Sequence, residues 1–472
     1  MGSVLNRRRF LTKLGLGCAE VGAVSMLSGI SSMGLLQAAV SANKSWVNTA
    51  PMGGDYKALV CIMLAGGNDS FNMLVPRDND SYNDYAAVRP SLAIPQSDLL
   101  ALNPLNASGG RAYGLHPSMP KIQSLFESEK LSFIANIGAL QRPTTLADYN
   151  SRTSLPLGLF SHSDQANHWQ TSVPGDKDAV GWGGRLSDLL SSNNQNQDIS
   201  MSISFDGLNL FQRGNEILPY TATRNVNGSV LLNGAINNGF YQTLKRETLD
   251  NILEHNHANA LEKAYANVVS SGKDISVGFD AAVANGPVLN TQFDETDRFQ
   301  QQLRMAARIM AARGGLSVSN QTFFISVNGF DTHDNHLADH SLLMSRLDEA
   351  LHNFQLALVE LGLDDCVTTF TMSDFGRKLA SNGDGSDHGW GGHSMVMGPA
   401  LPGKRIIGEY PELFLGSPLD TGAGRYIPTT STDELYAELA LWFGASNADL
   451  SYILPNLSNF WVPGQGTSPL GV

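Results

Sequence analysis

Cysteine is scarce in this sequence, since its 472 residues include only three. Cys18 lies in the N-terminal segment, which leaves Cys61 and Cys366 for the rest of the chain. Each of these two lies in an apolar, β-branched run, so two buried free thiols are expected, and a disulfide would require the two runs to be neighbouring strands. So few cysteines exclude a disulfide scaffold.

The sequence also lacks a long uninterrupted apolar run. Glycines, serines and an acidic residue dilute its N-terminal segment, whereas a transmembrane helix needs about 20 predominantly apolar residues, so we expect no stable membrane span. The segment opens with the arginine pair Arg7 and Arg8, which is typical of a twin-arginine export signal. We expect residues 1–42 to be this signal, cleaved after Ala39 or Ala42. The export machinery would then be a partner, and the mature protein would be periplasmic or secreted.

Basic residues are outnumbered by acidic ones, 31 against 44, which gives a net charge of −13. Nucleic-acid binding requires a basic surface, so this balance excludes nucleic acid as a partner. Charged residues make up 16% of the chain and hydrophobic residues 42%, which is the composition of a compact globular protein.

Six buried strands are predicted from continuous apolar runs. They lie in the segments "ALVCIMLAGGND", "LSFIANIG", "SMSISFDG", "QTFFISVNGFD", "CVTTFTMSD" and "HSMVMG". Helical periodicity appears between several of them, notably at 299–310 and 342–360. Strands that alternate with helices indicate a mostly parallel sheet covered on both faces, an α/β sandwich. We expect a single domain over residues 43–472, with helical insertions at about 205–315.

Three of these runs end on a carboxylate, at Asp69, Asp331 and Asp374. Potential ligands follow each acid: Asn72 after the first, His333 after the second, and His388 and His393 after the third. Because the carboxyl ends of parallel strands meet at one edge of a sheet, these side chains are expected to converge. Oxygen and imidazole ligands suit a divalent metal ion, and the sequence does not distinguish among zinc, calcium, magnesium and manganese.

Simpler interpretations exist for the same residues. An acid at a strand end often caps the following helix. His336 and His340, four residues apart at a predicted helix start, have the spacing of a ligand pair, but we expect them to lie on a solvated face. The glycine-rich "GDGSDHGWGG" lacks the Lys-Ser or Lys-Thr ending of a phosphate-binding loop.

Several motifs together carry a resemblance to a known family. "LAGGNDSFNMLVP", "FSHSDQANHW", "GFDTHDNH", "SDFGR", "GSDHGWGGH" and "IPTTSTDELYAELALWFG" occur in this order. The chain resembles the exported family called domain of unknown function fifteen-oh-one, which is similar to the alkaline phosphatase and sulfatase superfamily. That resemblance implies a three-layer α/β/α sandwich with metal sites at the carboxyl ends of its strands.

The resemblance also implies roles for individual residues. The metal ligands would be Asp69 or Asn72, Asp331, His333, Asp374 and His388, with His393 as an extra. The chain departs from the superfamily where Phe375 follows Asp374, because phosphatases carry an Asp-His pair there. A nucleophile is expected near the start of a helix after "LSFIANIG", and the candidates are Ser161, His162 and Ser163. The alternative for the two serines is that one of them caps this helix.

Two functions follow from these observations. The first is hydrolysis of phosphate or sulfate esters by an exported metal-dependent enzyme acting on a small ester substrate. The second is a catalytically silent, metal-stabilised protein that binds a polymer of the cell envelope. The missing histidine after Asp374 and the undefined nucleophile favour the second function, and the preserved acids and histidines favour the first.

The C-terminal segment predicts a structural helix. Ser431 stands three residues before Glu434, which is the spacing of a capping box, and Gly444 ends the pattern. Leu435, Leu439 and Trp442 are expected to form one buried stripe that packs on the sheet.

Overall fold

The computed structural model describes residues 56–107, 110–224, 228 and 240–472, so the export signal expected at residues 1–42 lies outside the described residues. A nine-stranded sheet forms the centre of this part of the chain, in the order β13-β5-β12-β9-β1-β8-β6-β7, with β14 paired to β5. These strands are β1 (Lys57–Ala65), β5 (Leu131–Gly138), β6 (Ser202–Ser204), β7 (Tyr220–Thr221), β8 (Asn320–Asn328), β9 (Val367–Ser373), β12 (Gly392–Met397), β13 (Ile406–Ile407) and β14 (Thr430–Ser431).

The sheet is mostly parallel, as predicted. Strand β1 runs parallel to both β8 and β9, and β12 alone runs antiparallel to its two neighbours, β5 and β9. The register aligns Leu64 of β1 with Val327 and with Ser373. The carboxyl ends of these three strands therefore meet at the same edge of the sheet.

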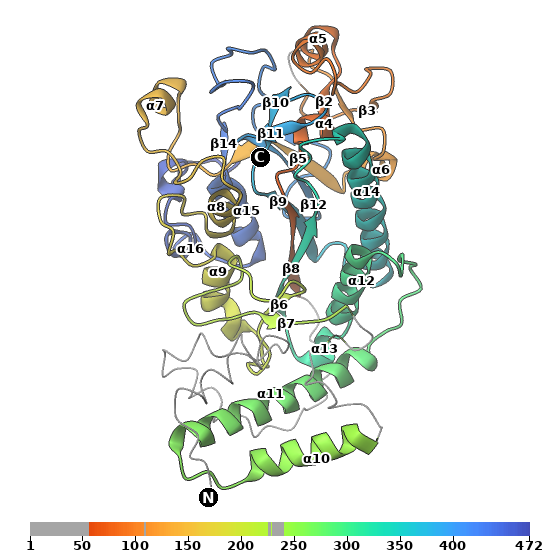
Figure 1. Ribbon diagram of the computed structural model, residues 1–472, viewed down its shortest axis with the longest axis vertical. Helices are drawn as coiled ribbons and strands as arrows, with labels where there is room; N and C mark the ends of the chain where they lie inside the picture. Colours follow the sequence, from red (N-terminus) through yellow and green to blue (C-terminus); the bar gives the residue numbers. More distant parts are fainter. Residues whose placement is uncertain (1–55, 108–109, 225–227, 229–239) are drawn as a thin grey trace, which may run out of the picture.

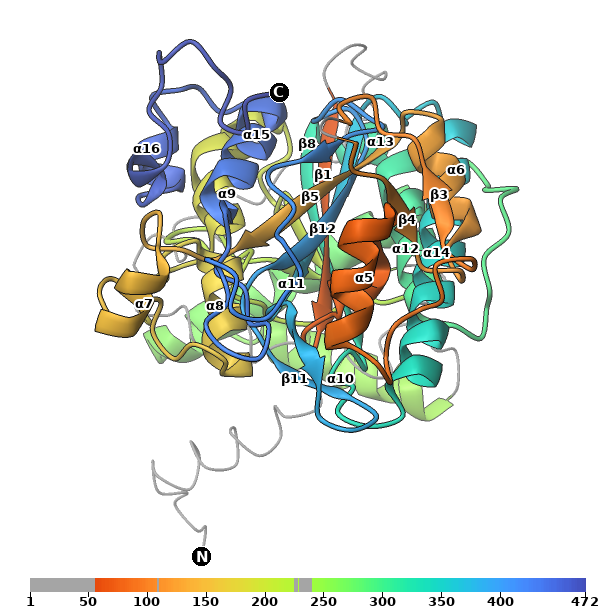
Figure 2. The same cartoon turned by 90° about the horizontal axis from the view of Figure 1, so that it is seen from above.

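Helices cover both faces of the sheet. Along β1, Val60 and Ile62 pack into one hydrophobic core, and Leu59 and Cys61 pack into a second core. This alternation follows from the two-residue period of a strand, and it explains why β1 is apolar throughout. In both views α12 and α14 lie on one side of the sheet, and α8 and α15 lie on the other (Figure 1, Figure 2). The chain thus forms a three-layer α/β/α sandwich.

The other elements surround this sandwich. The helices are α4 (Ser70–Met73), α5 (Asn79–Val88), α6 (Pro120–Glu127), α7 (Leu146–Ser151), α8 (His162–Thr171), α9 (Trp182–Leu190), α10 (Phe240–Glu254), α11 (Ala260–Ala284), α12 (Arg298–Ala311), α13 (Arg313–Leu316), α14 (His336–Glu360), α15 (Thr432–Phe443) and α16 (Leu450–Ile453), with short 3-10 turns at Ser191–Asn193 and Leu457–Asn459. A small sheet combines β2 (Leu74–Pro76), β4 (Tyr113–Leu115) and β3 (Leu100–Leu102), and β10 (Arg377–Ser381) pairs with β11 (Ser386–His388).

Two long helices, α10 and α11, pack side by side at the end of the molecule opposite β10 and β11 (Figure 1). They fall within the segment where helical insertions were expected. Across the described ranges, no helix combines the length and the apolar composition that crossing a membrane requires.

The two thiols of the described chain are free. Cys61 is buried as expected, whereas Cys366 is only half-buried. Strands β1 and β9 are neighbours, but Cys61 is paired with Phe370. Because Cys366 precedes Phe370 by four residues, at about 3.3 Å a residue, the two sulfur atoms are too far apart for a disulfide.

The C-terminal helix α15 begins as predicted. The side chain of Ser431 accepts a hydrogen bond from the first turn of the helix, and the Glu434 carboxylate accepts one from the Ser431 backbone N–H at 2.7 Å. Leu435 and Leu439 are buried, but the prediction that Trp442 continues their stripe is wrong, because Trp442 is half-buried. Phe443 takes that place, since the i, i+4 row of a helix leads from Leu439 to Phe443.

Candidate metal centre

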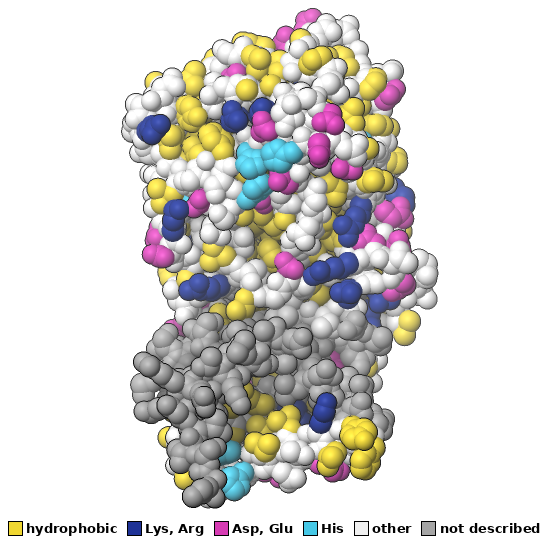
Figure 3. All heavy atoms as spheres, viewed as in Figure 1, with side chains coloured by type: hydrophobic (Ala, Val, Ile, Leu, Met, Phe, Trp, Pro, Cys, Tyr) yellow, Lys and Arg dark blue, Asp and Glu magenta, His cyan; other side chains and the backbone are white. Residues whose placement is uncertain are grey.

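A cluster of histidines and carboxylates lies at the carboxyl edge of the central sheet. Asp374 directly follows β9, Asp331 follows β8 after two residues, and His162 is the first residue of α8. The turns after β1 and β8 approach closely, because a Cβ atom on Gly66 would lie 2.5 Å from the Asp331 backbone nitrogen. Gly66 also has a φ of 115°, a conformation that favours glycine. Figure 3 shows histidine side chains gathered on this face, with acidic and basic side chains beside them.

His162 links the two acids. Its Nδ1 atom lies 2.7 Å from Oδ2 of Asp374, and its Nε2 atom lies 3.4 Å from Oδ2 of Asp331. The Gly66 N–H donates to the same Asp374 oxygen at 3.2 Å. A histidine that binds a metal ion with one ring nitrogen usually has its other ring nitrogen held by a carboxylate in this way.

His388 is held in the same way by a backbone carbonyl. Its Nδ1 atom lies 2.7 Å from the carbonyl oxygen of Phe160. A carbonyl can only accept a hydrogen bond, so Nδ1 carries the proton and Nε2 of the neutral ring presents a lone pair. This Nε2 atom lies 3.6 Å from Oδ1 of Asp331. Burial lowers the pKa of His388, which favours the neutral ring.

His333 completes the cluster. Its Nδ1 atom lies 3.3 Å from Oδ1 of Asp387, and its Nε2 atom lies 2.9 Å from Oδ1 of Asp331 and 3.2 Å from Nε2 of His388. Burial opposes the ionisation of Asp387, but the contacts with Lys378, Asn382 and His333 outweigh it and lower the Asp387 pKa to about 2. Asp387 is therefore an ionised acceptor for the His333 ring.

Arg377 holds the Asp331 carboxylate in place. The Arg377 side chain is fully buried, and its Nη1 atom donates to Oδ1 of Asp331 at 2.8 Å and to the Gly66 carbonyl oxygen at 3.0 Å. Burial raises the pKa of Asp331, but the hydrogen bond and charge of Arg377, with smaller contributions from His333 and His162, lower it overall. At Asp374 burial prevails over the His162 contact, and the pKa is raised.

The donor set fits a divalent metal ion. A nitrogen of His162, a nitrogen of His388 and an oxygen of Asp331 all lie within 4.8 Å of one another. With Nδ1 of each ring beside an acceptor, the neutral rings can turn their Nε2 lone pairs towards the Asp331 carboxylate. Two imidazoles with one carboxylate are a common ligand set for zinc.

Of the residues singled out in the sequence, Asp331, His333, His162, Asp374 and His388 come together here. Ser161 instead caps α8, since its hydroxyl accepts from the Asp164 N–H at 3.5 Å. Its Oγ atom also lies 3.2 Å from that of the exposed Ser163. This is the capping role that the sequence left open for one of the two serines.

Asp69 and Asn72 belong to a separate buried cluster. Oδ2 of Asp69 lies 2.8 Å from Arg89 and 2.8 Å from His336, and all three side chains are fully buried. The Asn72 side-chain oxygen accepts from Tyr85 at 2.7 Å and from Arg89 at 2.5 Å. Asp69 is fully enclosed by these partners, whereas the Asp331 side chain is 43% exposed and open to an ion from the solvent.

The expectation that His336 and His340 lie on a solvated face is wrong, because both are buried. The first turn of α14 packs over the turn that follows β1, where Asp69 requires hydrogen-bond partners. His336 Nδ1 also lies 2.6 Å from the Thr332 hydroxyl, and His340 Nε2 lies 3.1 Å from the Asn68 side-chain oxygen. Through the contact with His336, the cluster thereby anchors Thr332, the residue that follows Asp331.

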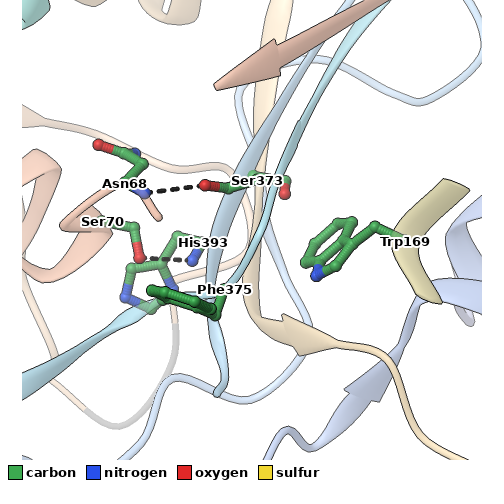
Figure 4. A pocket seen from close by; sticks show the side chains of 9 residues that line it. Asn68, Ser70, Trp169, Ser373, Phe375 and His393 are labelled. Atoms are coloured by element: carbon green, nitrogen blue, oxygen red, sulfur yellow. Dashed lines mark hydrogen bonds between the residues drawn. The ribbon is translucent and has the colours of Figure 1, made fainter. Parts of the chain in front are cut away.

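His393 is buried apart from Asp331. Its Nδ1 atom accepts from the Asn136 N–H at 3.1 Å, and its ring stacks on Tyr410 with the centroids 4.6 Å apart. Its backbone N–H donates to Ser70 Oγ at 2.7 Å (Figure 4). His393 lines a small pocket with residues that include Trp169 and Phe375, which are labelled in Figure 4.

Sequence reasoning gave no role to Arg377, Asp387 or Arg89. Arg377 and Asp387 lie inside quoted motifs, "SDFGR" and "GSDHGWGGH", so their proximity to the cluster had a signal in the sequence. Arg89 had none, because it lies 20 residues beyond Asp69 at the end of α5.

The fold and this cluster define an α/β/α protein with a histidine and carboxylate centre at the carboxyl edge of its sheet. The chain belongs to the family described as protein of unknown function (DUF1501), whose model matches residues 56–416, and the resemblance to that family is thereby confirmed.

Among solved structures, the chain is similar to Ps i-CgsB in complex with k-i-k-neocarrahexaose, with 13% identity, 83% of this chain and 73% of that chain covered, and a TM-score of 0.34. It is also similar to the PsFucS1 sulfatase from Pseudoalteromonas sp., with 10% identity, 93% and 76% covered, and a TM-score of 0.34. The sequence matches none of the curated proteins.

Proposed function

We propose that this protein is a metal-dependent hydrolase of phosphate or sulfate esters. One observation carries the proposal: the Nε2 atoms of His162 and His388 lie 3.4 Å and 3.6 Å from the Asp331 carboxylate oxygens. These three residues would hold the ion, and the two imidazoles favour zinc over calcium or magnesium. A divalent ion bound there would supply Lewis acidity towards the oxygen atoms of an ester.

The surrounding residues keep the three ligands in place. Asp374 orients the His162 ring, the Phe160 carbonyl orients the His388 ring, and Arg377 holds the Asp331 carboxylate. Because each ligand is fixed by a group that does not bind the ion, the centre needs little rearrangement to accept it. The Asp331 side chain is 43% exposed, which leaves room for a substrate from the solvent side.

His333 is proposed as the proton-transfer residue. Its Nδ1 atom faces the ionised Asp387, and its Nε2 atom faces Asp331 and His388. This arrangement allows the ring to hold a proton at Nε2 and to deliver it to the leaving oxygen of an ester, while Asp387 stabilises the charged ring. At 42% exposed, the His333 side chain is accessible to such a ligand.

The test is turnover of aryl phosphate and aryl sulfate esters by the full chain, with zinc, manganese, magnesium or calcium added to the metal-free protein. We expect zinc to restore turnover of at least one ester class. Activity should rise in proportion to the zinc content of the protein. Protein that binds one zinc ion tightly but turns over neither ester would contradict the proposal.

That outcome would favour a second candidate, a metal-stabilised protein without catalytic activity that binds a polymer of the cell envelope. One observation supports this candidate: in the described part of the chain, no hydroxyl nucleophile hydrogen-bonds to the proposed metal ligands. Ser161 caps α8 and Thr332 contacts His336. Among the described residues, no serine or threonine hydroxyl hydrogen-bonds to the side chains of His162, Asp331 or His388.

Export by the twin-arginine route is proposed from Arg7 and Arg8, which lie outside the described residues. This route carries folded cargo, so it would allow the centre to be loaded with metal before export. Changing both arginines to lysine should abolish accumulation of mature-length protein in the periplasm, measured by fractionation. Unchanged accumulation would refute this route.

A further inference from the structure

A second arginine, Arg425, lies against the candidate metal centre. It lies between β13 and β14 and is half-buried. Its Nε atom donates to the backbone carbonyl of His388 at 2.8 Å, and its guanidinium lies 5.2 Å from the centroid of the Phe160 ring. Phe160 is the residue whose carbonyl fixes the His388 ring. Arg425 is thus held against His388 and against the residue that positions its ring.

The charge of Arg425 is not neutralised by a carboxylate. Arg377 pairs with Asp331, and Lys378 pairs with Asp387. Within the described ranges, Arg425 forms no such pair, and its remaining hydrogen bond, from Nη1 to the Gly422 carbonyl, is long at 3.4 Å. Part of its planar donor group is therefore free to bind another acceptor.

The charges around the centre favour an anion. The carboxylates are those of Asp331, Asp374 and Asp387, and the fixed cations are Arg377, Lys378 and Arg425. Of these three cations, Arg425 alone forms no salt bridge among the described residues, so its charge remains available to a ligand that carries a negative charge.

We infer that Arg425 is an anion-binding residue that recognises the sulfate or phosphate group of a ligand held at this centre. A guanidinium presents parallel N–H donors whose spacing matches two oxygens of a tetrahedral oxyanion. The inference rests on the proposed function for the position of the ligand. It assigns to Arg425 the binding of the anion, whereas His162, Asp331 and His388 hold the metal.

The test uses the full chain loaded with zinc and titrated with inorganic sulfate and, separately, inorganic phosphate. Arg425→Gln should raise the dissociation constant of the preferred anion by about 10- to 100-fold. This is the loss of affinity expected when one or two charge-assisted hydrogen bonds are removed. Arg425→Lys should retain part of the affinity because it retains the charge. The more tightly bound anion then identifies the ester class.

Arg111→Gln is a matched control. Arg111 also donates to a backbone carbonyl, that of Tyr410 at 2.7 Å, and lies over an aromatic ring with a centroid distance of 6.0 Å. It contacts none of the centre's residues, so its substitution should leave anion affinity unchanged.

A measurement on the unaltered protein avoids dependence on the folding of the variants. Phenylglyoxal reacts with accessible guanidinium groups, and the modified residues can be mapped by mass spectrometry. The preferred anion should protect Arg425 but leave Arg111 unprotected.

The outcomes separate this inference from the proposed function, because zinc content is measured independently. Zinc-loaded protein that binds neither anion, equal affinities of the parent and Arg425→Gln, or equal modification of Arg425 with and without anion would each overturn the inference while leaving the metal centre intact. Protein that binds no zinc but binds an anion through Arg425 would refute the metal centre and support the anion site.

Discussion

His162 and Asp374 stand 212 residues apart in the sequence, yet Nδ1 of His162 lies 2.7 Å from Oδ2 of Asp374. The contact joins the first residue of α8 to the residue that follows β9. It turns the Nε2 atom of His162 towards Asp331, and the candidate metal centre depends on this orientation.

This relationship predicts graded effects on metal binding. His162→Ala and His388→Ala should each lose most bound zinc, because each removes a proposed ligand. Asp374→Asn should weaken zinc binding by only about 10- to 100-fold, since it removes the group that orients a ligand. Zinc content after dialysis against a common buffer measures both effects.

The double variant of His162 and His388 should lose little more zinc than either single variant, because one missing ligand already breaks the site. His255→Ala is the control, because His255 is exposed at the end of α10, away from the sheet. Equal zinc content in the parent and in all variants would mean that this cluster holds no ion.

His333 and His388 should separate catalysis from metal binding. His333→Ala should retain zinc but reduce ester turnover by about 100-fold or more, the usual contribution of a general acid. His388→Ala should lose both zinc and turnover. Loss of zinc from His333→Ala would instead make His333 a metal ligand, which is the role that the family resemblance implies for it.

The buried ion cluster predicts a large stability effect at a residue outside the metal centre. His336→Ala removes one partner of the buried Asp69 carboxylate and frees the Thr332 hydroxyl, so it should lower the free energy of unfolding by about 3–5 kcal/mol. Leu337→Ala, on the same helical turn but 43% exposed, should change it by less than about 1 kcal/mol. Denaturant unfolding of the two variants checks the comparison, and equal midpoints would show that the cluster contributes little.

Acid should destabilise the protein partly through His393. Burial lowers the pKa of His393 to about 3, from about 6.5 in an unfolded chain. Below pH 6.5 the unfolded state therefore binds a proton that the folded state does not, and stability falls as the pH falls, by about 1.4 kcal/mol per unit until the folded-state pKa is reached.

His393→Gln removes this titration, and its amide oxygen can still accept from the Asn136 N–H. The stability difference between the parent and His393→Gln should shrink by about 2 kcal/mol from pH 7 to pH 5. A difference that does not change with pH would show that His393 is protonated in the folded state as well.

The helix α15 predicts unequal effects for two of its apolar residues. Leu439→Ala should lower the free energy of unfolding by about 2–5 kcal/mol, because Leu439 is fully buried between helix and sheet. Trp442→Ala should cost less, since its ring is half-buried and contacts Lys57, whose Nζ atom lies 5.5 Å from the ring centroid. A larger loss from Trp442→Ala, measured by thermal or denaturant unfolding, would contradict the structure.

Local patterns in the sequence predicted much of the fold. The apolar runs of β1, β8 and β9 identify buried strands because their side chains must be apolar on both faces. Ser431 and Glu434 identify the start of α15 because a capping box involves only residues three positions apart. The carboxylates at the strand ends also placed Asp331 and Asp374 at one edge of the sheet, since parallel strands share that edge.

The sequence by itself therefore determined the α/β class, the family and the edge at which the polar residues gather. Only the tertiary structure decided which carboxylate is enclosed in the core and which lies exposed among several histidines. Asp69 and Asp331 both follow β-strands, but Arg89 and His336 enclose Asp69 in the core, whereas Asp331 is exposed beside three imidazole rings. The ionic partner of a carboxylate depends on contacts between distant segments, and no local periodicity encodes such contacts.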